Sequence, residues 1–215
     1  MLRSLRTLAA VSLLTLGFTS SAFAADKFEI DPGHSGVTFM TTHLGVGAFQ
    51  GRFNDISGSY MLDTADFSKS SIKLEVKAES VDTLDKKRDD HLRGPDFFNT
   101  KQFPKIAFES TSVAKNGDGT LKIAGKLSFH GVTKDVTFNA KFIGEGKDPW
   151  GGYRSGFYGE LVVKRSDFGV NFMPGGIGEE VTLRISIEGI KSDDSRACAR
   201  PRRILRAAAP LGPRA

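Results

Sequence analysis

The side chains best suited to acid–base chemistry gather in one segment, RDDHLRGPDFFNTKQFP, which begins at Arg88. Asp89 and Asp90 precede His91, and carboxylates beside a histidine can supply a general acid and a general base. Consecutive residues on a helix point in different directions, so these side chains are not expected to pair. A solvated charged turn is the simpler interpretation. We predict no catalytic residue, and a hydrolase that uses Asp89 or Asp90 with a histidine remains an alternative.

A serine nucleophile is not expected either. The segment GHSGV, residues 33–37, resembles a nucleophile elbow but misses its pattern by one position. It also opens a predicted strand, whereas the elbow joins a strand to a helix.

The four histidines are the candidates for metal ligands. His34 and His43 flank a predicted strand at an odd spacing, which places them on opposite faces if the strand is regular. His91 and His130 add no short zinc-type spacing, and no cysteine accompanies them. We predict no metal and no cofactor, while a site assembled by the tertiary fold remains an alternative.

The elements that must position these residues are strands. Apolar and polar residues alternate over long segments, and shorter alternating runs lie between turn signals. The long segments are 72–78, 121–129, 136–142 and 181–187, and the shorter ones are 37–39, 56–62, 106–108 and 157–163. No long helix is available to cover a sheet, so the chain is all-β, either a sandwich or a closed barrel. Glycines within or beside strands, such as Gly125 and Gly159, favour a barrel because they permit sharp bends.

Both ends of the chain differ from this pattern. Residues 1–24 combine Arg3 and Arg6, a short apolar run and the small-x-small site Ala22-Phe23-Ala24, which together predict a signal peptide cleaved near Ala25. Residues 192–215 are rich in Arg, Ala and Pro, contain the lone Cys198, and are predicted to be a disordered tail. The domain is therefore expected to span residues 25–191.

The positive net charge comes from the two ends of the chain. The formal charge is +5; the signal peptide carries +2 and the tail +4, which leaves −1 for residues 26–191. A nucleic-acid partner, which the high isoelectric point would suggest, is therefore not expected for the domain.

In a barrel, the apolar strand faces must point inward because no outer layer covers them. An eight-stranded barrel can fill with side chains or hold one small ligand, and the pattern alone leaves both open. If a ligand binds, the apolar candidates to contact it are Phe39, Leu74, Phe108, Leu127, Phe129, Phe138, Phe142 and Leu183.

Four ordered segments resemble the YceI family of exported lipocalin-like proteins. They are DPGHSGVTFMTTHLGVGAFQGRFNDISG, SVDTLDKKRDDHLRGPDFFNTKQFPKIAFES, LSFHGVTKDVTFNAKFIG and DPWGGYRSGFYGELVVKRSDFGV. The resemblance implies an antiparallel eight-stranded lipocalin-like barrel with a short helical insertion. It also implies an elongated apolar cavity for a polyisoprenoid, an isoprenoid quinone or another long-chain amphiphile, and no established enzymatic activity. The segment that begins at Arg88 would be a helix and loop at the barrel rim, with Phe97, Phe98 or Phe103 turned inward.

A long amphiphile must leave its polar end near water or give it hydrogen-bond partners, because an unpaired buried polar group is costly. The inward faces offer almost no donors, so strand ends and the inserted segment are the expected source. The candidates are His34, Arg88, Arg93 and Asp96. The alternative is that Arg88 and Asp96 only brace the loop against the barrel.

We therefore expect a periplasmic carrier, storage or sequestration protein for an isoprenoid lipid. An accessory protein that presents a quinone to a membrane redox partner is the alternative. No stable membrane insertion is expected, and the residues around the cavity mouth could also serve a homodimer contact.

Overall fold

The computed structural model describes residues 25–192. The predicted signal peptide and the tail beyond Ser192, with Cys198, lie outside the described residues, and what the sequence predicts for them stays a prediction. Ser192 itself is described, and its backbone N–H donates to the carbonyl of Lys27 at 2.8 Å. Among residues 25–192, no helix has the length and apolar character needed to cross a membrane.

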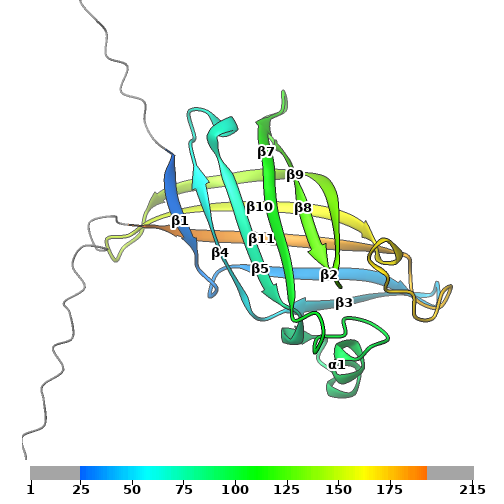
Figure 1. The fold of residues 1–215 in the computed structure, drawn as a ribbon. Helices are drawn as coiled ribbons and strands as arrows, with labels where there is room; N and C mark the ends of the chain where they lie inside the picture. The colour runs from blue at the N-terminus through cyan, green and yellow to red at the C-terminus, as the bar shows by residue number, and fades with distance from the viewer. Residues whose placement is uncertain (1–24, 193–215) are drawn as a thin grey trace, which may run out of the picture.

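The described chain consists of strands with one α-helix and three short 3₁₀ turns (Figure 1). The strands are β1 (Asp26–Ile30), β2 (Gly36–His43), β3 (Gly47–Phe53), β4 (Ile56–Leu62), β5 (Ser71–Lys77), β6 (Val81–Asp82), β7 (Lys105–Lys115), β8 (Leu121–Phe129), β9 (Val132–Lys147), β10 (Tyr153–Lys164) and β11 (Glu180–Lys191). The helix is α1 (Lys86–Arg93), and the 3₁₀ turns are η1 (Phe67–Lys69), η2 (Ala78–Ser80) and η3 (Arg165–Phe168).

The sheet closes on itself. The ring runs β1-β4-β5-β7-β8-β9-β10-β11 and returns to β1, where Phe28 lies opposite Lys191. Beyond the β1–β2 turn, β11 pairs with β2, β2 with β3, and β3 with β6. The pairs β1/β2, β3/β4 and β5/β6 are thus halves of longer interrupted strands. The predicted eight-stranded antiparallel barrel with a short helical insertion is confirmed, and the sandwich is excluded.

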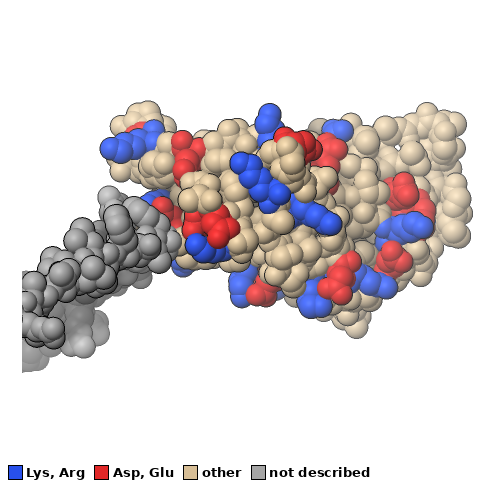
Figure 2. Space-filling view, turned by 90° about the horizontal axis from the view of Figure 1, so that it is seen from above, with Lys and Arg blue, Asp and Glu red and all other residues tan. Residues whose placement is uncertain are grey.

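Strand alternation places the apolar faces inside. On β8, Leu121, Ile123 and Leu127 are buried, while Lys122 and Lys126 are exposed. Figure 2 shows the result on the outer wall, where basic and acidic side chains lie close to one another. The inward glycines have a role that the sequence interpretation missed. A Cβ on Gly125 would lie 2.5 Å from the ring of Phe108, so this glycine makes room for an aromatic ring.

Several element boundaries differ from the sequence prediction. β9 begins at Val132 because the preceding turn needs only His130 and Gly131, both in the left-handed region. β1 and β3 were not predicted, since β1 is short and β3 carries glycines at inward positions.

The inserted segment is a helix and loop, as the resemblance implied. Asp85 caps α1 by accepting from the backbone N–H of Arg88 at 2.9 Å, and Gly94 ends the helix. The solvated-turn interpretation is wrong for Asp89. This carboxylate is buried and accepts from the backbone N–H and the hydroxyl of Thr83, at 2.9 and 2.5 Å. It therefore ties α1 to the end of β6.

Candidate ligand-binding cavity

One half of the barrel contains a cavity of about 510 Å³. It lies between β2, β3, the adjoining parts of β8, β10 and β11, the inserted segment around α1, and the loop of residues 165–178. The lining is mostly aromatic and aliphatic and includes Phe39, Phe53, Phe98, Leu127, Val163 and Leu183. This volume falls within the ~300–1,000 Å³ of typical small-molecule sites, which are also mainly apolar.

The eight apolar candidates all belong to the barrel core, but they fall into separate groups. Phe39, Leu127, Phe129 and Leu183 line the large cavity. Phe138 lines a second void of about 50 Å³ in the other half of the barrel. Leu74, Phe108 and Phe142 pack in the core and are not among the residues that line either space. Ligand contact by these eight residues stays a prediction.

Arg88 is the candidate polar residue that reaches the large cavity. Its Nε donates to the hydroxyl of Thr83 at 2.8 Å, and its Nη2 donates to the carbonyl of the same residue at 2.7 Å. The guanidinium also lies over the ring of Phe49, 4.7 Å from the centroid. These contacts brace α1, as the alternative interpretation expected, and they also hold the cation at the cavity wall.

Asp96 does not line the cavity, but it pairs with a histidine that does. Its Oδ2 lies 2.8 Å from Nε2 of His91, which lines the cavity between the rings of Phe97 and Phe172. His91 thus pairs with Asp96, whereas Asp89 and Asp90 have other partners. Phe97 and Phe98 also line the cavity, as the resemblance implied. Phe103 instead packs against the ring of His130.

Arg93 and His34 do not line the cavity. Arg93 donates to the carbonyls of Glu79 and Val81 at 2.8 Å each, and so fixes α1 to η2 and β6. His34 lies in the β1–β2 turn, where its Nδ1 is 2.9 Å from Oδ2 of Asp31. A head-group role for either residue stays a prediction, but each side chain already has a partner elsewhere.

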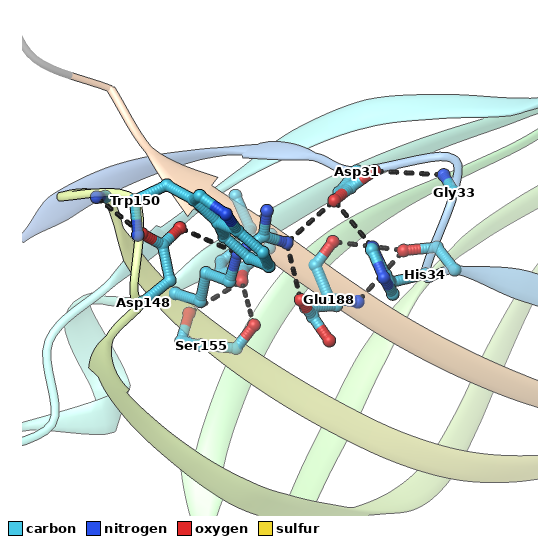
Figure 3. Close-up of polar contacts among 11 residues, drawn as sticks. Asp31, Gly33, His34, Asp148, Trp150, Ser155 and Glu188 are labelled. Carbon is cyan, nitrogen blue, oxygen red and sulfur yellow. Dashed lines mark hydrogen bonds and ion pairs between the residues drawn. The ribbon is translucent and has the colours of Figure 1, made fainter.

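Asp31 belongs to an ion-pair network centred on Arg154 (Figure 3). Nη1 of Arg154 is 2.7 Å from Oδ2 of Asp31 and 2.6 Å from Oε1 of Glu188, and its Nε is 3.0 Å from Oδ2 of Asp148. Donation by Arg154, and then by His34, lowers the pKa of Asp31 from 3.8 to about 2. Asp31, His34 and Glu188 lie close enough to hold a cation. The guanidinium of Arg154 already pairs with both carboxylates, so a cation would have to compete with it.

The sequence interpretation missed the loop of residues 165–178. Arg165 is buried, and its guanidinium donates to the carbonyls of Gly178, Val170, Phe172 and Ile177, at 2.8–3.2 Å. Four carbonyls therefore fold the loop around one side chain. The sequence signal for it is a run without charge from Phe168 to Gly178.

Known proteins share both the sequence pattern and the architecture of this chain. Residues 28–189 match the family described as the YceI-like domain. A UPF0312 protein of Pseudomonas aeruginosa is 45% identical over 188 residues, which cover 86% of this chain and 98% of that protein. A UPF0312 protein of Yersinia pestis is 42% identical and is covered to 97%.

Solved structures show the same fold. The YCEI protein of Campylobacter jejuni, 28% identical, superposes with a TM-score of 0.61 over 71% of this chain and 90% of that one. A domain from Saccharophagus degradans described as polyisoprenoid-binding is 16% identical, with a TM-score of 0.58 over 77% of this chain and 98% of that one. At that identity the second comparison supports the fold alone.

Proposed function

The chain belongs to the YceI-like domain family, and from this premise we propose that it binds a long-chain isoprenoid or a related amphiphilic lipid. The observation that carries the proposal is the apolar cavity of about 510 Å³ within the barrel. A packed core would leave no such space, because protein interiors contain few voids larger than a water molecule.

The cavity suits a hydrocarbon chain in both shape and chemistry. Phe39 and Leu183 lie opposite one another on β2 and β11, and Leu127 adds an aliphatic wall from β8. Burial of a methylene contributes about 0.8 kcal/mol, so a five-carbon isoprene unit contributes roughly 3–4 kcal/mol before the costs of association. A domain described as polyisoprenoid-binding shares this fold, so a barrel of this type can accommodate a ligand of the proposed class.

A polar head group would meet Arg88 and the His91–Asp96 pair at the cavity wall. Arg88 uses Nε and Nη2 on Thr83, and its planar fork can present further donors to a hydroxyl, carbonyl or phosphate oxygen. Arg165 is less suited, since its donors are engaged by loop carbonyls.

The role that we propose is carriage, storage or sequestration in the periplasm, by a binding protein and not an enzyme. The signal-peptide features of residues 1–24 support export. Asp89 already accepts a hydrogen bond from Thr83, and Asp90 already pairs with Lys86. These contacts argue against an acid–base role for the two carboxylates.

The test is a fluorescence titration with geranylgeraniol carrying a nitrobenzoxadiazole label. Leu183→Trp should narrow the cavity and weaken binding by about tenfold or more, because the ligand loses part of the space that it would occupy. Val162→Trp is the matched control, since Val162 lies on the neighbouring strand and is 54% exposed. Equal affinities of the wild type and Leu183→Trp would refute the cavity as the site.

A further inference from the structure

Two loops that contribute residues to the lining of the large cavity join at one end of the barrel, at the right of Figure 1. They are the β2–β3 turn, residues 43–47, and the loop of residues 169–178, and we call them together the mouth rim. The backbone N–H of Leu44 donates to the carbonyl of Gly176 at 2.7 Å, and that of Gly178 donates to the carbonyl of Thr42 at 2.9 Å. The two loops are therefore fixed to each other as one surface.

The mouth rim carries no Asp, Glu, Lys or Arg. Charged residues make up 26% of the whole chain, so this end of the barrel departs from the composition of the remainder. In Figure 2, the extreme right-hand end of the molecule is tan, whereas blue and red atoms are dispersed over the surface to its left. A surface without charge offers little to a partner recognised by electrostatic complementarity.

Large apolar side chains are exposed on this surface. Val46 is 87% exposed and Leu44 52%, both on the β2–β3 turn. Met173 is 43% exposed and Phe172 37%, both on the second loop. Clustered exposed apolar residues on a soluble protein mark a site of interaction with another protein or with a membrane.

Leu44 occupies its position against its conformational preference. It has φ of 53° and Gly45 has φ of 67°, in a turn where the backbone N–H of Val46 donates to the carbonyl of His43 at 3.1 Å; such left-handed positions favour asparagine and glycine. Left-handed backbone is unfavourable for a residue with a branched side chain. Leu44 therefore stands where asparagine or glycine would be less strained, and its exposed side chain adds apolar surface to the mouth rim.

The mouth rim is continuous with the cavity. His43, Gly47, Phe172, Met173 and Ile177 line the cavity and belong to the rim. An apolar chain that leaves the cavity here meets exposed apolar side chains before it meets water.

We propose that the mouth rim docks reversibly on the surface of a lipid bilayer, with Leu44, Val46, Phe172 and Met173 inserted among the lipids. The inference rests on the proposed function, since a carrier of an isoprenoid chain must exchange it with a membrane. An uncharged apolar surface around an apolar opening matches the acyl region of a bilayer, where no charged group would lose its hydration.

The test is flotation of the exported protein with phosphatidylcholine vesicles, and with vesicles that also contain phosphatidylglycerol. The wild type should bind both to a similar extent at low and high salt, because no basic residue of the rim attracts an anionic headgroup. Binding that requires phosphatidylglycerol and disappears at high salt would overturn the proposal.

Two variants separate docking from folding. Leu44→Asn supplies the residue that the turn favours, so the melting temperature should be kept or raised while vesicle binding falls. With Val46→Asp added, partition to vesicles should fall by about tenfold or more. Val162→Asp places the same charge on an exposed valine of β10 and should leave vesicle binding unchanged. We call the double variant Leu44→Asn with Val46→Asp the rim variant. Equal losses of vesicle binding in Val162→Asp and the rim variant would overturn the proposal.

Titration of the same variants with labelled geranylgeraniol in vesicle-free buffer distinguishes this inference from the proposed function. The rim variant should keep wild-type affinity there and should extract the probe from vesicles more slowly. Probe binding by a wild type that does not float would overturn docking alone. Flotation without probe binding would overturn the proposed ligand alone. A wild-type dimer that becomes monomeric in the rim variant, by analytical ultracentrifugation, would show that a second copy covers the rim and would overturn docking.

Discussion

The two halves of the barrel are built by the same long strands, yet one is packed and the other is hollow. In the packed half, aromatic rings meet across the interior. The ring centroids of Tyr60 on β4 and Phe157 on β10 are 5.5 Å apart, and those of Phe67 and Phe142 are 5.8 Å apart. A void of about 50 Å³ lies there, against about 510 Å³ for the cavity in the hollow half. Identical alternation of residues therefore yields core in one place and cavity in the other.

What differs is the set of elements that close each half. In the packed half, Phe67 of η1 is buried, and the Tyr60 hydroxyl donates to the carbonyl of Ser155 at 2.9 Å. Burial raises the pKa of that hydroxyl to about 12, which keeps it a neutral donor. In the hollow half, Arg93 of α1 donates to the carbonyl of Val81, and Arg165 donates to carbonyls of its own loop, such as that of Val170. Phe98 of the inserted segment and Phe168 of the loop around Arg165 both pack against Phe129, yet a cavity of about 510 Å³ remains beside these rings.

The strongest test of this contrast uses two leucines on the inward face of β8. Leu121 lies in the packed half and is buried, so Leu121→Ala should lower the free energy of unfolding by about 2–5 kcal/mol. Leu127 borders the large cavity and already lacks neighbours on one side. Leu127→Ala should therefore cost about 2 kcal/mol or less and should weaken binding of labelled geranylgeraniol. Urea unfolding measures the stability, and a larger loss for Leu127→Ala would break the comparison.

A second, smaller effect concerns the attachment of α1. Asp89→Ala leaves the buried N–H and hydroxyl of Thr83 without their acceptor, which should cost about 1–3 kcal/mol. Asp90→Ala is the matched control, because Asp90 pairs with Lys86 and Arg93 at the surface and should change stability by about 0.5 kcal/mol or less. Thermal unfolding distinguishes the two, and equal losses would mean that the buried contact does not hold the helix.

The smallest expected effect is a pH dependence from the outer wall beside the packed half. Since Arg154 and His34 lower the pKa of Asp31 from 3.8 to about 2, the stabilisation from this carboxylate is present above pH 3.8. It is lost as the pH falls toward 2, because the folded state must then take up a proton that the unfolded state already holds. Urea unfolding between pH 5 and 2 should therefore show a shallower pH dependence in Asp31→Asn than in the wild type.

Asp135→Asn is the control for that series, because Asp135 pairs only with exposed Lys126 among the contacts described. It should retain the wild-type slope. A slope in Asp31→Asn as steep as that of the wild type would mean that the Arg154 network contributes no stability at acid pH.

The barrel could be predicted from sequence because alternation is a local property. Leu121 to Phe129 on β8 shows it over nine residues, with Gly125 as the one inward position without a side chain, and the absence of a helix long enough to cover a sheet left few architectures. β3 is shorter and has another inward glycine, Gly47, so its alternation is too weak to predict the strand around Gly51. The physical reason is tertiary: a Cβ there would lie 2.3 Å from the ring of Phe39.

The candidate site was less predictable because a cavity depends on contacts between distant segments. Phe138 and Phe129 follow the same inward pattern, yet they line different spaces. Arg93 and Arg88 lie on the same short helix and looked equivalent, but the helix turns one to the wall of η2 and the other to the cavity. The loop around Arg165 has no periodicity at all, since carbonyl acceptors and not side-chain pattern determine its shape.

The central claim is that the hollow half holds an isoprenoid chain, and mass spectrometry of the bound lipid tests it most directly. Wild type and Leu183→Trp would be purified in parallel from the producing bacterium, extracted with organic solvent and quantified per mole of protein. The account predicts about one isoprenoid lipid per wild-type chain and a strong depletion in Leu183→Trp, with Val162→Trp retaining the wild-type content. Equal isoprenoid content in wild type and Leu183→Trp, or a wild type without any isoprenoid, would contradict it.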